Sequence, residues 1–328
     1  MPFFKPSQLM SDDKGGLMKT FIRATEVWVP SHDGSQLELA SGDYGELQAL
    51  RDISTQMAFK FDEGLPGKAW ANGQPMLLKR FENSYFRRAE LATQLGLTCG
   101  IAIPVFSGEF IKAVLVFLCG DDEEHVGAIE VWYNNAAISY DMTLHDGYYG
   151  SAEIFEWLSS STRFRRGEGL PGLAWQKNYP VLIPELSASS QFVRQSEALK
   201  VGLNKAIGLP FVSGQQTSVV TLLSAYGTPL ARRIEVWRPD SSRNRLVFDT
   251  GQCDINPELA EVYGHLSIER GHGVIGHAWL SGIPQVRSVD IPDPCIAEAN
   301  AKKSGLQTVV ALPMISNGRL TSVVSWYF

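Results

Sequence analysis

The sequence predicts an α+β fold (an α/β chain in the broad sense) made of three tandem copies of one unit, each a mostly antiparallel sheet with short helices. The first observation is a heptapeptide that reads GLPGKAW at residues 64–70, GLPGLAW at 169–175 and GVIGHAW at 273–279. The second is a Glu-Val-Trp triplet that ends at Trp28, Trp132 and Trp237. Both motifs return after 104 or 105 residues, and so constant a spacing indicates an internal repeat. A length of 328 residues accommodates three domains.

Each unit is predicted to open with a β-hairpin. The Trp-bearing segments are rich in β-branched and aromatic residues, as strands are, and they cover 24–29, 128–133 and 233–238. Turn-forming residues follow each segment, for example Asp33 and Gly34 in the first copy. The second strand of the hairpin is expected at 37–40, 138–144 and 246–249.

The heptapeptide is predicted to form a helix of roughly two turns, shorter than the average helix. Pro66 and Pro171 suit the first turn, because a residue there needs no N–H donor and the fixed φ of proline is already helical. The helix should end at residues that adopt the left-handed conformation, namely Gly73, Asn178 and Gly282. The glycine in the middle of the heptapeptide should let the helix lie close to a neighbouring backbone.

A short strand, a second helix and two closing strands complete each unit. The short strand begins at Pro75, Pro180 and Pro284. The second helix is amphipathic, stops at a glycine and is expected at 85–95, 192–201 and 295–304. The closing strands are predicted at 99–106 with 111–118, 205–212 with 218–225, and 308–315 with 322–328. Residues 114–118 are all apolar, so the last strand should be central in its sheet.

This order of elements and the heptapeptide resemble the GAF domain, a sensory fold. The resemblance implies three tandem GAF-like domains at 21–121, 122–228 and 229–328, after a leader of residues 1–20. GAF domains usually carry long helices at both ends, which build a dimer interface. The connections after Leu118 and Ala225 are too short for such helices, so strands could instead be exchanged at the domain borders.

Composition and charge limit the classes of partner that the protein is expected to bind. A net charge of −6 and a pI of about 5.6 favour neither nucleic acid nor an anionic membrane. No apolar run reaches the roughly 20 residues that a membrane span needs. Four cysteines without a CxxC pair make no disulfide framework and indicate a reduced, cytoplasmic protein.

The resemblance implies a small-molecule pocket between the sheet and the helix-bearing loops. In the first two domains the residues at these positions are Trp70, Phe81, Tyr85, Phe86 and Cys99, then Trp175, Phe192, Arg194 and Lys205. In the third they are Trp279, Cys295 and Thr308. The alternative is that these side chains only fill a core, which is the interpretation we favour for the three tryptophans because they repeat identically. Cys99, Lys205 and Thr308 share one position and vary, which makes them the better pocket candidates.

The functional hypothesis that follows is a non-enzymatic sensory or regulatory protein that binds an unidentified small-molecule ligand and signals through a protein partner, with a homodimer as a further hypothesis. One alternative is a structural or protein-interaction module with closed pockets. Another is a cysteine-dependent redox enzyme of the free methionine sulfoxide reductase type, through Cys99 or Cys119. No catalytic motif, metal-ligand spacing or cofactor signature occurs in the sequence; His272 and His277, for example, are five residues apart.

Overall fold

The computed structural model describes residues 19–120 and 125–328 and contains three six-stranded antiparallel sheets. The strand orders are β3-β2-β1-β6-β5-β4, β9-β8-β7-β12-β11-β10 and β15-β14-β13-β18-β17-β16, so the three sheets share one topology. Each sheet takes its strands from one stretch of chain, which we call unit 1 (β1 to β6), unit 2 (β7 to β12) and unit 3 (β13 to β18). The predicted fold class, an α+β fold of three repeated domains of antiparallel sheet with short helices, is confirmed.

The elements follow the predicted order in every unit. Unit 1 contains β1 (Ile22–Pro30), β2 (Gln36–Asp43), α1 (Gln48–Ser54), β3 (Ala58–Lys60), α2 (Gly64–Asn72), β4 (Met76–Leu78), α3 (Ala89–Gln94), β5 (Cys99–Ser107) and β6 (Phe110–Cys119). Unit 2 contains β7 (Gly127–Asn135), β8 (Met142–Tyr148), α4 (Glu153–Ser161), β9 (Arg163–Phe164), α5 (Gly169–Lys177), β10 (Val181–Ile183), a 3₁₀ turn (Leu186–Ala188), α6 (Gln195–Lys200), β11 (Leu203–Ser213) and β12 (Gln216–Ala225). Unit 3 contains β13 (Arg233–Pro239), β14 (Arg245–Cys253), α7 (Leu259–Tyr263), β15 (Ser267–Glu269), α8 (Gly273–Ser281), β16 (Gln285–Ser288), α9 (Ile296–Lys303), β17 (Thr308–Ser316) and β18 (Arg319–Tyr327).

The helices α2, α5 and α8 form as the heptapeptide predicts. Their C-cap residues Gly73, Asn178 and Gly282 have φ angles of 65°, 47° and 66°, the left-handed conformation that ends a helix. A Cβ on Gly67 would lie 2.1 Å from the carbonyl oxygen of Lys60, so only glycine allows this close approach. Gly172 and Gly276 meet the same constraint against Arg165 and Glu269.

The sequence missed one helix and one strand in each unit, and it misplaced β8. The helices α1, α4 and α7 and the short strands β3, β9 and β15 fall in a stretch without a clear period. The second strand of unit 2 was expected at 138–144 but starts at Met142. The reason is a longer turn, in which the amide of Asn134 donates to the carbonyl oxygens of Ser139 and Asp141 and holds 136–141 out of the ladder.

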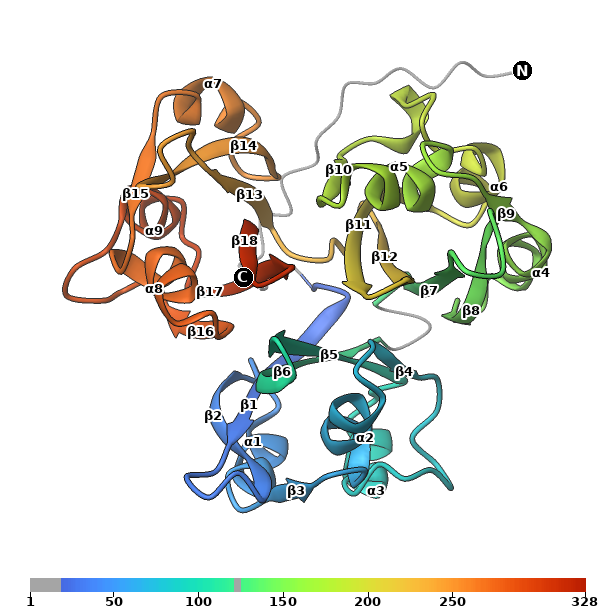
Figure 1. The fold of residues 1–328 in the computed structure, drawn as a ribbon, viewed down its shortest axis with the longest axis horizontal. Coiled ribbons are helices and arrows are strands. Elements are labelled where there is room, and N and C mark those ends of the chain that lie inside the picture. The colour runs from blue at the N-terminus through green and yellow to red at the C-terminus, as the bar shows by residue number, and fades with distance from the viewer. Residues whose placement is uncertain (1–18, 121–124) are drawn as a thin grey trace.

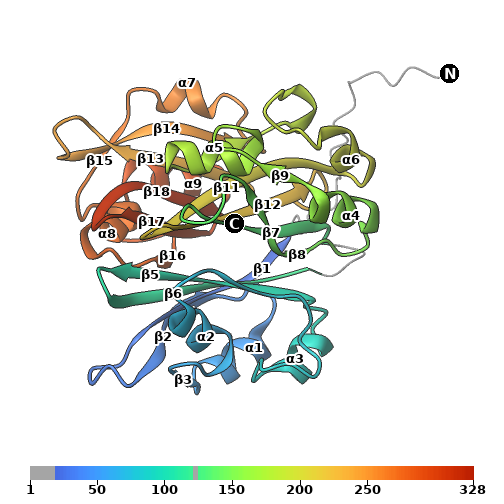
Figure 2. The ribbon, with the colours of Figure 1, turned by 45° about the vertical axis from the view of Figure 1, so that its right-hand side comes forward.

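The three sheets form a closed ring, with their helices on the outside (Figure 1). The face of each sheet that carries no helix points inward, and the three faces share one hydrophobic core. At its centre the ring of Phe117 packs edge-on against Trp326, with the ring centroids 5.4 Å apart. Figure 2 shows the same arrangement from the side, with the sheet of unit 1 lying across the other two. The neighbouring units therefore cover the sheet face that carries no helix.

The borders between units show no strand exchange. In the part of the chain that the structure describes, every strand pairs only with strands of its own unit. Two backbone hydrogen bonds lie near the unit borders: the Phe21 amide donates to the carbonyl oxygen of Pro229, and the Gly120 amide donates to that of Phe21. Residues 1–18 of the leader and the acidic residues 121–124 lie outside the described residues. None of the described helices is long and apolar enough to cross a membrane.

Candidate functional site

A buried glutamate lies at the centre of each unit, between the sheet and its helices. Glu26, Glu130 and Glu235 precede the strand tryptophan by two residues, and side chains two apart on a strand share a face. The indole Nε1 of each tryptophan donates to this glutamate at 2.8–2.9 Å. All three glutamates and all three tryptophans are inaccessible to solvent.

In units 1 and 2 an arginine neutralises this glutamate. In unit 2 the two terminal nitrogens of Arg194 meet the two carboxylate oxygens of Glu130 at 2.5 and 2.8 Å. Tyr149 and Thr221 donate to the same carboxylate at 3.1 and 2.7 Å. Burial would raise the pKa of Glu130, but the charge and hydrogen bonds of Arg194 outweigh it and hold the pKa below its usual value. Unit 1 repeats this arrangement with Arg88, Glu26 and Tyr44.

Unit 3 keeps the glutamate, but its arginine lies on a strand of the sheet instead of at the helix. Arg233 comes from β13, at the position held by Ala24 and Ala128, while Ala297 replaces the helix arginine. The closest approach of Arg233 to Glu235 is 3.7 Å, so the pair has no direct hydrogen bond. Burial therefore dominates and raises the pKa of Glu235 despite the charge of Arg233.

Unit 3 differs at a second place, the start of α8. Ile275 replaces the proline of the other heptapeptides and so adds a backbone N–H to the first turn. The buried carboxylate of Glu298 accepts hydrogen bonds from the N–H groups of Val274 and Ile275 at 2.7 and 3.4 Å. It also accepts from the N–H of Cys295 at 2.8 Å. This carboxylate fills the space beside the helix N-terminus.

Aromatic rings fill the rest of these interiors. Trp28 lies edge-on to Phe59, and Trp132 edge-on to Phe164, each at 4.7 Å between centroids. In unit 3 Trp237 contacts Phe248 at 5.5 Å. The space beside the strand tryptophan is thus occupied by the protein's own aromatic side chains in all three units.

Four of the predicted site residues of unit 1 gather around α2 and α3. Phe81 and Phe86 are buried with centroids 4.4 Å apart. Trp70 is half-buried against Phe61, and Tyr85 is half-buried with the ammonium group of Lys68 5.2 Å from its ring. Three predicted residues of unit 2 also lie on the helix side: Trp175, Phe192 and Arg194, the last with its guanidinium carbon 5.3 Å from the Phe192 ring.

Cys99 and Lys205 are not brought together with these residues. Cys99 lies in the shared core of the ring, on the sheet face away from the helices. Lys205 is buried at the border of units 2 and 3, where it pairs with Asp254. The sequence contained evidence for the placement of Cys99. Gly100 and Ala102 are small, which suits the sheet face that a helix contacts, and Cys99 points to the other face because successive residues of a strand alternate. The unit 3 positions divide in the same way. Cys295 lies on the helix side, and burial raises the pKa of its thiol. Thr308 lies on the same strand face as Val310, which belongs to the shared core of the ring.

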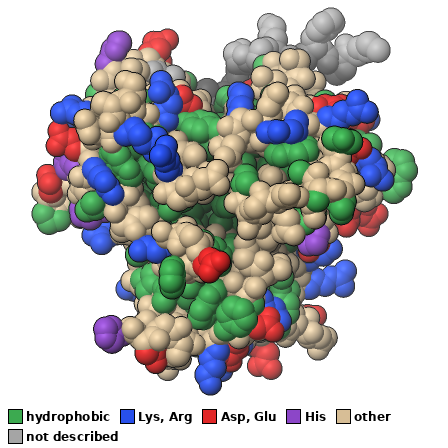
Figure 3. Space-filling model, viewed as in Figure 1, with side chains coloured by type: hydrophobic (Ala, Val, Ile, Leu, Met, Phe, Trp, Pro, Cys, Tyr) green, Lys and Arg blue, Asp and Glu red, His purple; other side chains and the backbone are tan. Residues whose placement is uncertain are grey.

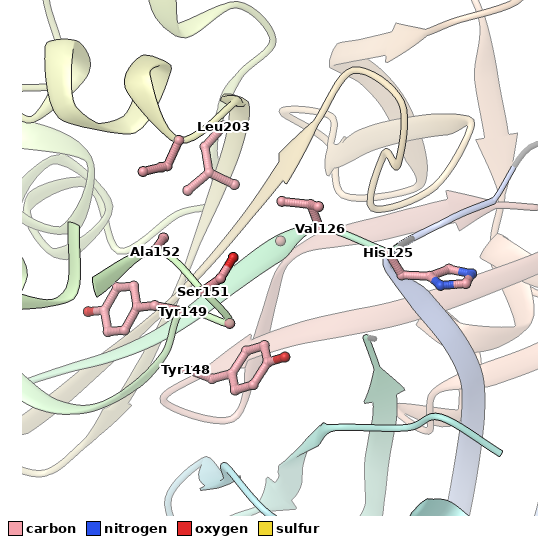
Figure 4. A pocket seen from close by; sticks show the side chains of 10 residues that line it. His125, Val126, Tyr148, Tyr149, Ser151, Ala152 and Leu203 are labelled. Carbon is pink, nitrogen blue, oxygen red and sulfur yellow. The ribbon is translucent and has the colours of Figure 1, made fainter. Parts of the chain in front are cut away.

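Two adjoining hollows meet at the end of β8: the first is lined only by residues on the side of unit 2, and the second lies between units 1 and 2. One has a volume of about 170 Å³, and Figure 4 shows the side chains that line it, including Tyr148, Ser151 and Leu203. The other, which we call the junction groove, has a volume of about 390 Å³. Both are bounded by residues 148–150, at the end of β8.

The junction groove has a polar rim over an aromatic base. Its base contains Phe81, Tyr148 and Tyr149, and the hydroxyl groups of Tyr148 and Thr98 lie 2.6 Å apart. Lys79 stands at the rim and pairs with Asp146 of unit 2 at 2.8 Å. Arg80, Glu82 and Glu156 also line the groove and are exposed. The described residues contain no group of three His, Cys, Asp or Glu side chains that could hold a metal ion.

Comparison with known proteins gives similarity over single units only. No protein-family model matches the chain, and no curated protein matches it. Among solved structures, a free methionine-R-sulfoxide reductase from Neisseria meningitidis in complex with its substrate is 16% identical, over 30% of this chain and 52% of its own, with a TM-score of 0.24. A GAF domain from A. aeolicus is 27% identical, over 30% of this chain and 57% of its own, also with a TM-score of 0.24.

A GAF domain from an Acinetobacter phosphoenolpyruvate-protein phosphotransferase is 13% identical, over 31% of this chain and 60% of its own, with a TM-score of 0.24. The matched part of this chain therefore spans little more than half of each of these structures. Similarity at this level concerns the architecture of one unit, and it identifies neither a ligand nor an activity.

Proposed function

We propose that this chain of three tandem GAF-like units is a non-enzymatic regulatory protein, which binds a small molecule in the junction groove and signals through a protein partner. The observation that supports this is the position of the junction groove, which lies between units 1 and 2, while aromatic rings fill the space beside each strand tryptophan. A ligand between units 1 and 2 contacts both, so its binding would change how tightly the two units hold together. The four buried cysteines are thiols and form no disulfide, which fits a reduced, cytoplasmic setting.

The chemistry of the groove favours a small zwitterion. Arg80 and Lys79 offer positive charge to an anionic group, and Glu82 and Glu156 offer negative charge to a cationic one. The phenol rings at the base offer an apolar surface to the rest of the molecule. A volume of about 390 Å³ suits a ligand of the size of an amino acid or a dipeptide. Under this proposal Trp70, Tyr85 and the other helix-side candidates support the fold instead of touching the ligand, except Phe81 at the base.

The test is a binding screen of the full chain against amino acids and dipeptides, by thermal shift and then calorimetry. A hit should lose about tenfold or more in affinity when Arg80 or Glu156 is changed to alanine. Glu261→Ala, an exposed carboxylate on α7 of unit 3, is the matched control and should bind as the parent does. A ligand whose affinity ignores Arg80 and Glu156 would contradict the assignment of the groove.

A second candidate is a protein-interaction module with closed pockets, and the aromatic rings packed beside the strand tryptophan of all three units favour it. It predicts no small-molecule binding at the groove, together with a partner protein whose binding survives Arg80→Ala and Glu156→Ala. The redox alternative has less support, since Cys99 and Cys119 are inaccessible in the shared core and a reactive thiolate must reach its substrate. An assay for reduction of free methionine sulfoxide tests it directly.

A further inference from the structure

The outer side of unit 2 carries exposed apolar side chains on two helices in contact, α4 and α6. We call them the α4 surface: Ile154 and Trp157 on α4, Val193 just before α6, and Leu199 on α6. Trp157 is 71% exposed and Ile154 69%. Green side chains stand out at the right-hand edge of Figure 3, where Figure 1 places these helices. An exposed apolar cluster of this kind marks an interaction site.

The internal repeat shows that this apolar character is specific to unit 2. The matching positions are Ala49, Asp52, Arg87 and Thr93 in unit 1 and Glu258, Glu261, Ile296 and Lys302 in unit 3. Six of these eight side chains are polar or charged. The position equivalent to Trp157 is acidic in both other units. The three units share the same elements, so the fold does not require a large apolar side chain at these two α4 positions. The apolar cluster occurs in a single copy, which calls for an occupant outside the ring.

The geometry of α4 suits a partner helix that runs in the opposite direction. Trp157 is the midpoint of Glu153–Ser161 and, at 3.6 residues per turn, faces away from the buried Phe155 and Ser159. Glu153, four residues earlier, lies on the same exposed line. Arg163 follows the C-terminal end of the helix and is exposed. Neither Glu153 nor Arg163 has an ion-pair partner among the described residues.

We propose that the α4 surface binds a second copy of this chain, with the two α4 helices antiparallel about a two-fold axis at Trp157. In that arrangement the Glu153 of each copy lies beside the Arg163 of the other, so opposite charges meet at both ends. The antiparallel helix dipoles add to this complementarity. A two-fold interface uses the same patch on both copies, which fits a surface that occurs once per chain.

The dimer is expected to be weak. A single helix pair buries less than the roughly 1,600 Å² of a standard interface, so association should depend on concentration in the micromolar range or above. Sedimentation velocity of the full chain across that range measures it. The parent should shift from monomer to dimer, and Trp157→Glu should stay a monomer. Tyr140→Glu, at a 92% exposed aromatic in the β7–β8 turn of the same unit, is the matched control and should dimerise as the parent does.

Charge reversal gives a second test that does not depend on the tryptophan. Glu153→Arg leaves both ends of α4 positive, and Arg163→Glu leaves both ends negative, so each variant alone should dimerise more weakly than the parent. A mixture of the two pairs positive ends with negative ones and should restore a heterodimer, which native mass spectrometry resolves by mass. A parent that stays monomeric at all concentrations, or a mixture no better than its components, would overturn the proposal. A dimer unaffected by Trp157→Glu would overturn it as well.

Discussion

The guanidinium group of Arg233 lies 3.5 Å from the carbonyl oxygen of Ala297 and fills the interior of unit 3 from the strand side. The same two positions hold Ala128 and Arg194 in unit 2, where the guanidinium group enters from the helix side. Each strand glutamate thus has one buried arginine beside it, which arrives by one of two routes. A second arginine would bury two like charges beside the same carboxylate, which explains why each arginine faces an alanine.

Exchanging the two residues of unit 3 should rebuild the arrangement of units 1 and 2. Arg233→Ala alone leaves Glu235 without a counter-charge, at an expected cost of about 3–5 kcal/mol in the free energy of unfolding. Ala297→Arg alone buries a second cation and should also destabilise. The double variant should recover most of the loss, as a double-mutant cycle in chemical denaturation would show. A double variant no more stable than the weaker single variant would contradict this account.

The ion pair of unit 2 should be essential for stability. Arg194→Met removes both hydrogen bonds to Glu130 and leaves its carboxylate buried and unpaired, for an expected loss of about 3–5 kcal/mol. Arg165→Met, at a side chain that is 82% exposed, is the control and should change stability by about 0.5 kcal/mol or less. Urea denaturation measures both. If the two variants lost equal stability, the pair would not have the role assigned to it.

The dependence of stability on pH should have opposite signs for Glu130 and Glu235. The pKa of Glu130 is lowered in the folded state, so its contribution is present above its usual value of 4.5 and is lost as the pH falls through the folded pKa. The pKa of Glu235 is raised, so its contribution falls as the pH rises from 4.5 towards the folded pKa.

Urea denaturation from about pH 3 to about pH 7 separates the two glutamates. Glu130→Gln should reduce the loss of stability at the acid end of the profile. Glu235→Gln should instead remove a loss that sets in as the pH rises. Parallel profiles for the two variants would contradict the opposite shifts in pKa.

The start of α8 offers a rescue experiment. Glu298→Ala removes the acceptor of the Val274, Ile275 and Cys295 N–H groups and should cost about 1–3 kcal/mol or more, because buried donors are left unpaired. Ile275→Pro removes one of these donors, as in the other two units, and should be less harmful in the Glu298→Ala background than in the parent. Thermal denaturation of the four proteins measures this coupling. Additive effects of the two changes would mean that Glu298 does not act on this N–H.

The repeats determined most of each unit from the sequence alone. Gly73, Asn178 and Gly282 ended their helices where expected, because left-handed backbone is a local requirement that few residues meet. The strands around Trp28 and its copies were likewise predicted, because β-branched and aromatic side chains favour extended backbone locally. The stretch before the heptapeptide was not resolved, since α1 and β3 depend on packing against the sheet and carry no period of their own.

Tertiary structure alone decided what lies in the interiors and between the units. Arg194 and Glu130 are 64 residues apart in sequence, so no local pattern marks them as a pair. Cys99 and Lys205 face the ring and its borders because three sheets cover one another's inner faces, and that arrangement depends on contacts such as Phe117 with Trp326, across the whole chain. The sequence by itself determined the unit and its number of copies. The closure of the ring determined which faces are filled and which remain open to a partner, because only distant residues brought together can bury a shared core.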